Sequence, residues 1–305
     1  MKSVTLKHLR YFDALAQYGH FGRAASECGV TQPALSTQIK ELEALTGAPL
    51  VERSTRKVHL TALGEKFARR TRLILTEISE LSDLVRAEKD VFFSELNIGF
   101  IPTIAPYVLP SVISVMKGRF PHAKLRPREA ITSELVEDLH SGDLDLAMVA
   151  LPLDEPNLQE FPLFEEEFLL VRPPESRLEP HPTAAEMATM QVLLLREGHC
   201  FRDQALSYCE ANSATPSDVI EGSSLSTLVG MVSVGMGVTL IPEMAAPVET
   251  TLNGVSVSRF PDPPPTRSVG LVWRQSNPLV EEFMRFASVV KSARLKPNPN
   301  GLSDA

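Results

Sequence analysis

Two cysteines that lie nine residues apart have the most distinctive chemistry in this sequence. Cys200 precedes residues 201–211, a segment that reads as a helix and contains Cys209. A thiol at a helix N-terminus, flanked here by His199 and Arg202, is expected to have a lowered pKa, and the thiolate is the form of cysteine that acts as a nucleophile. Attack on a peroxide oxygen gives a sulfenic acid, which condenses with a second thiol. We therefore predict that Cys200 is the reactive cysteine and that Cys209 is the candidate resolving thiol.

The distance between these two thiols decides how they could react. If residues 201–211 are helical, the two cysteines lie about 13 Å apart, at a rise of ~1.5 Å per residue. A disulfide needs Cα atoms within roughly 7 Å of each other. The segment must therefore unwind before the bond can form, and local unfolding of a weakly held segment can serve as a two-state element.

Other residue types that carry chemistry form no recognisable site. Cys28 falls on the packed side of a short N-terminal helix and is expected to be a core residue. His20, His59 and His140 lack the spacing of metal ligands. The sequence also lacks a phosphate-binding glycine-rich loop and a Ser/His/Asp set. We therefore predict no metal, no cofactor and no enzymatic activity.

Length and composition are those of a soluble globular protein with two or three domains: 305 residues, of which 43% are hydrophobic and 22% charged. The N-terminus has no apolar stretch that could serve as a signal peptide, and the longest apolar stretch, 228–242, is too short to cross a bilayer. We expect a cytoplasmic protein without membrane contact, whose three cysteines form no permanent disulfide framework.

The net charge of −8 is distributed unevenly along the chain. Residues 1–72 contain 12 Lys/Arg against 6 Asp/Glu, a net +6, whereas residues 73–305 contain 18 against 32, a net −14. A basic N-terminal region joined to an acidic body concentrates positive potential where the phosphates of a nucleic acid would bind.

The basic region has the pattern of a winged helix-turn-helix. Apolar residues at three- and four-residue steps predict a first helix that Gly19 ends, and residues 21–27 predict a second. Thr31 can cap a third helix, whose outer side carries side chains that can read base edges. Residues 50–60 predict a β-wing against the sugar-phosphate backbone. The residues that we expect to contact DNA are Gln32, Pro33, Ser36, Gln38, Lys40, Arg53, Thr55 and Arg56.

A long helix should connect this region to the rest of the chain. Thr61 can cap it, and the helix should run to about Lys89. Its apolar residues form a seam that favours helix pairing in a dimer over packing in a core: Leu63, Phe67, Ile74, Ile78, Leu81 and Val85. The sequence thus predicts a DNA-binding domain at 1–60, a linker and dimerisation helix at 61–90, a regulatory domain at 91–292 and a disordered tail at 293–305.

From about residue 92 strands and helices alternate, which predicts a parallel α/β sheet with ligands at the carboxyl ends of its strands. Residues 105–117 predict a helix that Gly118 ends. Changes of pattern near residues 164 and 260 divide the body into lobe I, residues 91–164 plus 268–292, and lobe II, residues 165–267. The fold class is therefore α/β, with an α-rich winged helix-turn-helix domain and a two-lobed effector domain similar to periplasmic binding proteins.

The first ninety residues resemble LysR-type transcriptional regulators. The motifs are Phe21-Gly-Arg-Ala-Ala25, Val30-Thr-Gln-Pro-Ala-Leu-Ser36, Ile39-Lys-Glu-Leu-Glu43 and Leu50-Val-Glu-Arg-Ser-Thr-Arg56. Val51 departs from the family, which usually has an aromatic residue there. The resemblance implies a DNA-binding activator in which linker helices form a dimer, two dimers form a tetramer, and the tetramer binds interrupted inverted repeats and contacts RNA polymerase.

A second resemblance narrows the family to its OxyR branch, which senses hydrogen peroxide. It lies in Gly198-His-Cys200, in Arg202-Asp-Gln-Ala205 and in the spacing to Cys209, with further matches at 99–107, 129–132 and 235–242. The resemblance implies that peroxide oxidises Cys200 and that Cys209 resolves it in a reversible disulfide. The other residues it implies at the site are His199, Arg202, Asp203, Thr103 and Thr132. Oxidation would then reshape lobe II, rotate the dimer contact and change the spacing of the DNA-binding domains.

Two other functions compete with this interpretation. A LysR-type regulator could bind a small organic effector between its lobes, with the cysteines as incidental core residues. A thiol peroxidase could use the same cysteines, but the basic N-terminal region would then have no purpose.

Overall fold

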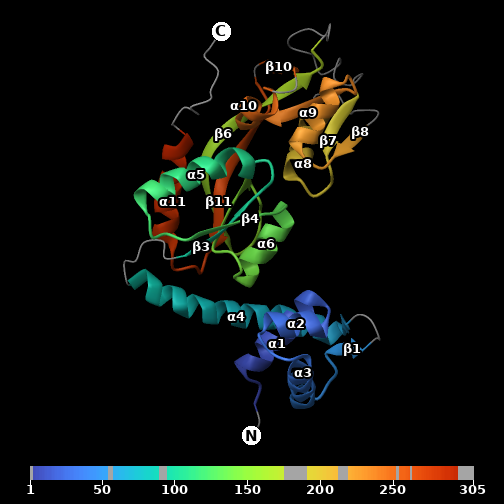
Figure 1. Ribbon diagram of the computed structural model, residues 1–305, viewed down its shortest axis with the longest axis vertical. Coiled ribbons are helices and arrows are strands. Elements are labelled where there is room, and N and C mark those ends of the chain that lie inside the picture. Colours follow the sequence, from blue (N-terminus) through green and yellow to red (C-terminus); the bar gives the residue numbers. More distant parts are fainter. Residues whose placement is uncertain are drawn as a thin grey trace. The chain divides into compact units, whose positions relative to one another are not determined.

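The computed structural model describes residues 3–53, 58–88, 95–174, 191–211, 219–251, 254–261 and 263–294 of the chain. The chain folds as two compact units (Figure 1). The first comprises Met1–Lys89 with His140–Gly142, and the second comprises Asp90–Leu139 with Asp143–Ala305. No described helix is both long and apolar enough to span a membrane.

The first unit contains the expected winged helix-turn-helix, followed by a long helix. Its elements are α1 (Leu6–Tyr18), α2 (Phe21–Glu27), α3 (Gln32–Thr46), β1 (Val51–Arg53), β2 (Val58–Leu60) and α4 (Ala62–Glu88). β1 and β2 pair in antiparallel fashion, with Val51 opposite Leu60, and form the wing. The prediction of this domain type from local sequence patterns is confirmed.

Helix ends in this unit follow the predicted chemistry with one exception. Gly19 ends α1 in the left-handed region, at φ 58°, and its N–H bonds to the Leu15 carbonyl. The Thr61 hydroxyl accepts a hydrogen bond from the Gly64 N–H at 2.9 Å and so caps α4. Thr31 occupies the N-cap position of α3, but its side chain makes no capping bond.

The predicted pairing seam along α4 stays a prediction for its exposed residues and is wrong for Phe67. Leu63, Ile74 and Leu81 are 46%, 47% and 61% exposed on the single chain. Phe67 instead packs edge-on against Phe12 in the core of the DNA-binding domain, with ring centroids 5.3 Å apart. Large exposed apolar side chains on one helix are what a helix-pairing surface requires. The side chain of Val85 lies outside the described residues.

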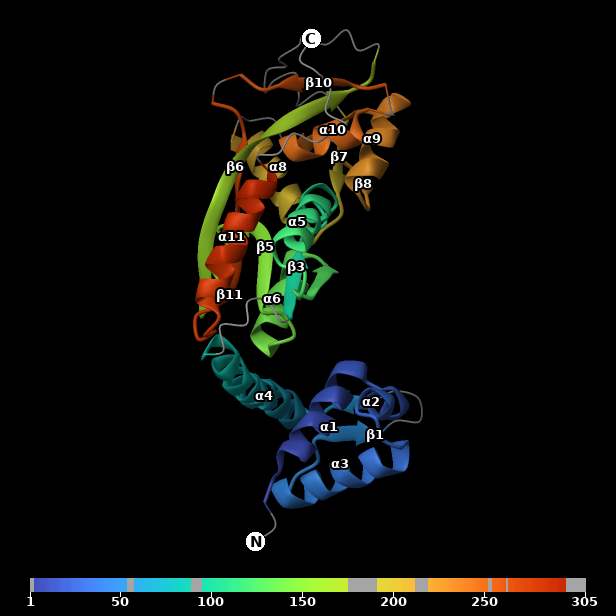
Figure 2. The same cartoon turned by 60° about the vertical axis from the view of Figure 1, so that its left-hand side comes forward.

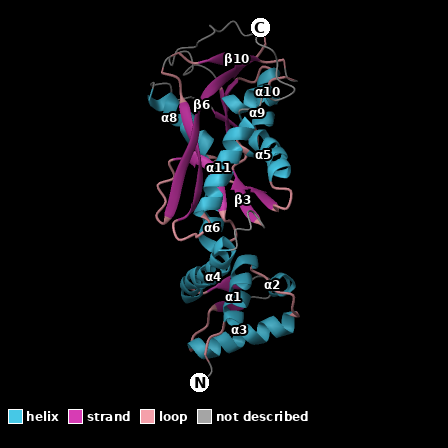
Figure 3. Cartoon of the chain, turned by 90° about the vertical axis from the view of Figure 1, so that its left-hand side faces the viewer, coloured by secondary structure: helices cyan, strands magenta, loops and turns pink. Residues whose placement is uncertain are grey.

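The second unit is an α/β domain built on strands in the order β4-β3-β5-β11-β6-β9-β7-β8, with β10 paired to β6. Helices flank the strands (Figure 3). The strands are β3 (Leu96–Phe100), β4 (Leu125–Glu129), β5 (Leu146–Leu151), β6 (Leu158–Arg172), β7 (Val192–Leu195), β8 (Val219–Gly222), β9 (Val238–Pro242), β10 (Ser256–Arg259) and β11 (Thr266–Arg274). The helices are α5 (Ala105–Arg119), α6 (Thr132–Ser141), α8 (Cys200–Ala211), α9 (Leu225–Ser233), α10 (Ala246–Glu249) and α11 (Val280–Arg294), with a 3-10 turn at Glu243–Ala245.

Two apolar cores divide this domain into lobes, as the sequence predicts. In lobe I, β3 pairs in parallel with β4 and β5, and α5 and α11 pack together. In lobe II, β7 pairs in parallel with β8 and β9. The antiparallel pair β6 and β11 connects the lobes, and Figure 2 shows the long β6 running through both. The boundary between the lobes therefore falls within these two strands. α5 continues through Gly118 to Arg119, so the predicted end of that helix is wrong.

Candidate redox site and DNA-binding surface

Cys200 is the first residue of α8, directly after the turn that leaves β7. Gly198 in that turn has φ 92°, a conformation that residues with a Cβ rarely adopt. The turn brings Cys200 to the edge of the lobe I core, where it is half-buried and free of a disulfide. The predicted position of Cys200 is thus what the structure has.

A narrow cavity brings Cys200 together with three of the predicted site residues. Cys200, His199, Thr103 and Thr132 all line it, and its walls pack too closely to admit a water molecule in this conformation. Thr103 follows β3 and Thr132 begins α6, so lobe I supplies the two hydroxyls. Lobe II supplies the thiol and the imidazole. Neither Arg202 nor Asp203 lines this cavity.

A buried ion pair holds the Thr103 hydroxyl in place. Arg267 donates to the Thr103 hydroxyl at 2.8 Å and to the Thr103 carbonyl at 3.0 Å. Its guanidinium also donates to Glu166 at 2.8 Å, and both side chains are fully buried. Because the hydroxyl oxygen accepts from arginine, its proton is left to donate into the cavity. Sequence reasoning missed this pair, whose only signal was two opposite charges inside apolar strands.

Thr132 has a buried hydroxyl without a hydrogen-bond partner among the described residues. A buried polar group of this kind is uncommon, and it marks a place where a small polar ligand would be stabilised. Thr132 and Cys200 line the same narrow cavity.

His199 and Arg202, which flank Cys200 in the sequence, differ in their charge. Burial, together with the neighbouring charge of Arg196, lowers the pKa of His199 below its ordinary value. The imidazole is therefore mainly neutral at neutral pH, so it brings little positive charge to the site. Arg202 donates to the Leu195 carbonyl at 3.0 Å and forms an ion pair with Glu221 at 2.7 Å.

Cys209 lies in the same unbroken helix as Cys200. Nine residue steps at ~1.5 Å each separate their Cα atoms by about 13.5 Å along the axis, well beyond the roughly 7 Å that a disulfide allows. The side chain of Cys209 lies outside the described residues. The two sulfurs can bond only after α8 unwinds. Cys28 packs against the core of the DNA-binding domain, and burial raises the pKa of its thiol.

Helix α3 presents most of the predicted DNA-contacting side chains. Gln32, Pro33 and Lys40 are exposed and Ser36 and Gln38 are partly exposed. Arg53 ends β1, but its side chain lies outside the described residues, as do Thr55 and Arg56. The described part of the chain contains no cluster of His, Cys, Asp and Glu that could hold a metal ion.

Two protein-family profiles match the chain. The bacterial regulatory helix-turn-helix protein of the lysR family matches residues 6–65, and the LysR substrate binding domain matches residues 90–292. The chain belongs to the LysR family. Within this family of regulators, which is not a class of enzymes, it groups with OxyR proteins.

Individual relatives show where this chain falls within the LysR family. The probable hydrogen peroxide-inducible genes activator of Streptomyces viridosporus is 42% identical over 297 residues, 96% of this chain and 95% of that protein. The DNA-binding transcriptional dual regulator OxyR of Escherichia coli K12 is 36% identical over 296 residues, 95% of each chain.

Solved structures of OxyR proteins have the same fold. A full-length cysteine-to-aspartate variant of OxyR from Pseudomonas aeruginosa matches with a TM-score of 0.77 and 34% identity and covers 97% of both chains. A cysteine-to-serine variant of OxyR from Corynebacterium glutamicum, solved with hydrogen peroxide bound, matches with a TM-score of 0.66 and 33% identity. It covers 96% of this chain and 93% of the other.

Proposed function

We propose that this LysR protein is a peroxide-responsive transcription regulator of the cytoplasm. Hydrogen peroxide oxidises Cys200, and the oxidised residue then forms a reversible disulfide with Cys209. The observation that carries the proposal is the shared cavity of Cys200, Thr103, Thr132 and His199 at the start of α8. Relatives over nearly the full length, named as peroxide-inducible activators, support the same signal.

The first step is a displacement on oxygen. The Cys200 thiolate attacks one peroxide oxygen, an S–O bond forms as the O–O bond breaks, and hydroxide leaves to take up a proton as water. The hydroxyl of Thr103, fixed by Arg267, and the unpartnered hydroxyl of Thr132 can stabilise the charge on the departing oxygen. Neutral His199 can form a hydrogen bond with the peroxide without donating a proton to the Cys200 thiolate.

The second step needs α8 to unwind. The Cys209 thiol attacks the sulfenic sulfur, the disulfide forms and water leaves. Because Phe201 and Ala205 anchor α8 in lobe II, movement of this helix changes the packing of that lobe. We propose that this change alters contacts within a homotetramer, a dimer of dimers, and so the spacing of the DNA-binding domains. Reduction of the disulfide would reverse it.

On DNA, α3 is the element that reads bases. We propose that base edges are contacted by Gln32, Ser36 and Gln38, and that Pro33 packs against the bases. The phosphates are contacted by Lys40, Arg53, Thr55 and Arg56. We propose promoter operators as the DNA sites and RNA polymerase as the further partner. Ser36→Ala together with Arg53→Ala should abolish footprints on a target promoter while the thermal unfolding of the protein stays unchanged.

The decisive experiment measures oxidation and transcription together. Micromolar peroxide should produce a Cys200–Cys209 disulfide, detected by mass spectrometry, and should activate a target promoter. Cys200→Ser should lose both responses, whereas Cys209→Ser should stop at the sulfenic acid. A promoter that still responds to peroxide in Cys200→Ser would overturn the proposal.

A second candidate function rests on a cavity between the lobes. Its volume is about 400 Å³, and its lining includes Tyr107 of lobe I and Arg196, Ser224 and Glu249 of lobe II. A small organic effector could bind there, because the matching family profile describes this domain as a substrate binding domain. This function would be favoured if Cys200→Ser kept a response to a small molecule and Arg196→Ala removed it.

A further inference from the structure

Cys200 borders a second space, on the side away from the cleft between the lobes. This outer groove has a volume of about 470 Å³ and is formed by α6, the segment after β5 and the first turn of α8. The narrow cavity described above shares Thr132 and Cys200 with this groove, and shares Thr103 and His199 with the cleft. Cys200 itself lines the outer groove and the narrow cavity but not the cleft, so the outer groove is the wider approach to its sulfur.

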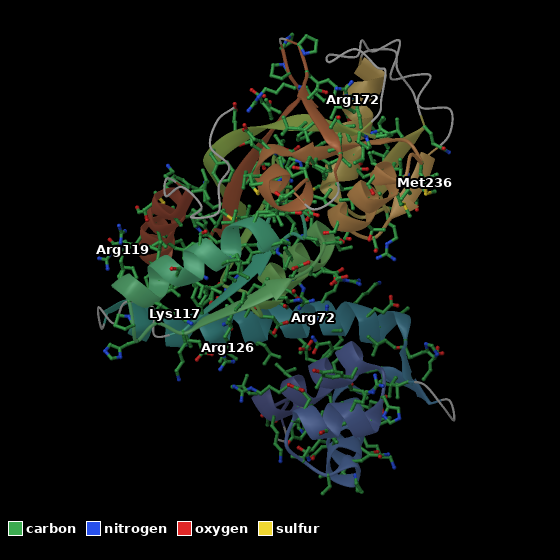
Figure 4. All side chains as sticks on the ribbon, turned by 45° about the horizontal axis from the view of Figure 1, so that its top comes forward. Arg72, Lys117, Arg119, Arg126, Arg172 and Met236 are labelled. Carbon is green, nitrogen blue, oxygen red and sulfur yellow. The ribbon has the colours of Figure 1, made fainter. Side chains whose placement is uncertain are left out.

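The outer groove and the cleft differ in the charges of the residues that line them. The outer groove is lined by three exposed carboxylates, Glu137, Glu155 and Asp203, and by no Lys, Arg or His among the described residues. No ion pair of the described residues neutralises these three. The basic side chains of lobe I labelled in Figure 4, Lys117 and Arg119 at the end of α5 and Arg126 on β4, lie elsewhere on its surface.

The cleft, in contrast, has charges of both signs. The cationic side chain of Arg196 lines it together with the carboxylates of Glu129, Glu134 and Glu249. A neutral peroxide is indifferent to this contrast, but a charged thiol or disulfide is not. Like charges raise the free energy of approach, and a groove walled by protein strengthens the effect relative to open water.

We propose that the outer groove is an electrostatic filter in front of Cys200, which admits neutral and cationic sulfur compounds and disfavours anionic ones, glutathione among them. The proposal rests on the peroxide-sensing function above. A sulfenic acid at Cys200 can be captured by any thiol that reaches it: the thiol sulfur bonds to the cysteine sulfur and water leaves. By slowing anionic thiols, the carboxylates leave the sulfenic acid for Cys209.

The filter can be measured with disulfides of similar size and different charge. The Cys200 thiolate attacks one sulfur of the reagent, a protein–reagent disulfide forms, the reagent's S–S bond breaks, and its other half leaves as a thiolate. Cystamine is cationic, bis(2-hydroxyethyl) disulfide neutral and 3,3′-dithiodipropionate anionic. The protein is the full chain with Cys209→Ser, so that the adduct at Cys200 persists and can be located by peptide mass spectrometry.

We expect cystamine to modify Cys200 about tenfold faster than dithiodipropionate at low salt, with the neutral reagent between them. Added salt should compress the order. The ratio between reagents cancels any change in the fraction of thiolate. Glu137→Gln with Glu155→Gln should reduce the ratio several-fold. The matched control, Glu129→Gln with Glu134→Gln, removes the same charge from the cleft and should leave the ratio unchanged.

Two outcomes overturn the filter: equal rates for the three reagents, or a ratio that only the cleft control changes. Peroxide oxidation of Cys200 is measured on the same samples. If peroxide still oxidises Cys200 while the charge order is absent, the filter fails and the proposed function stands. If the charge order is present while peroxide leaves Cys200 reduced, the proposed function fails instead.

Discussion

Helices α3 and α8 both carry functional side chains in their first turns, but the fold holds them by different means. α3 is anchored along its length by Leu35, Ile39 and Leu42, none of which is exposed to solvent. The carboxylate of Glu43, near its C-terminal end, accepts the N–H groups of Leu50 and Val51 at 2.9 and 3.2 Å and so connects the helix to the wing. These contacts fix the position of α3 within the DNA-binding domain.

In its described part, α8 has two buried side chains, and Arg202 ties its first turn to the Leu195 carbonyl and to Glu221. Phe201, 2% exposed, packs against Phe168 with ring centroids 4.8 Å apart, and Ala205 is fully buried behind it. Between them the Gln204 side-chain oxygen is buried and has no hydrogen-bond partner among the described residues, which costs stability. In the proposed function, the helix that reads DNA must keep its geometry, whereas the helix that brings two sulfurs together has to come apart. The packing of each suits that task.

The largest expected effect removes an anchor of α3. Leu35→Ala should cost about 2–5 kcal/mol, because it leaves a cavity in the core of the DNA-binding domain. Much of that domain would then be unfolded, and affinity for an operator, measured by fluorescence anisotropy, should fall steeply. The rate at which peroxide oxidises Cys200 should not change. A parallel fall in both quantities would contradict the separation of the two helices' roles.

A smaller effect follows from strengthening α8. Gln204→Leu replaces the unpartnered buried oxygen by an apolar group and should stabilise the reduced helix by about 1–2 kcal/mol. Formation of the Cys200–Cys209 disulfide should then slow by about tenfold. The preceding sulfenic acid step, followed by trapping with dimedone, should keep its rate, since Gln204 does not line the cavity. Unchanged disulfide formation would mean that unwinding of α8 does not limit the reaction.

The contrast between the two helices was partly readable in the sequence. The buried face of α3, the glycine that ends α1 and the place of Cys200 at a helix start all follow from local spacing and capping, which need no knowledge of distant residues. The side of α3 that faces DNA follows from the same periodicity. Phe67 was misjudged because a seam pattern on a helix does not reveal which of its turns meets another domain's core.

Arg267 and Glu166 could not be found in this way. They lie 101 residues apart and meet only because β11 pairs with β6 in a register that places them opposite each other. The neutral state of His199 has a similar origin, since its burial depends on how lobe I packs against the start of α8. Sequence spacing thus located the proposed reactive thiol, while the groups proposed to orient its substrate depend on long-range pairing.

The smallest effect tests whether the helical state of α8 itself sets the rate. Ser207 is exposed, and its hydroxyl bonds back to the Asp203 carbonyl at 2.8 Å, so substitutions there change helix stability and little else. Ser207→Ala should favour the helix by about 0.5 kcal/mol and Ser207→Gly should disfavour it by a similar amount. Disulfide formation should therefore become about twofold slower in the first and twofold faster in the second.

The matched change in α3, Ala44→Gly at an exposed position, should lower the stability of the DNA-binding domain and leave the disulfide rate untouched. If the alanine and glycine variants at Ser207 form the disulfide at one rate, unwinding occurs elsewhere than in the middle of α8, and the comparison between the two helices loses its kinetic meaning.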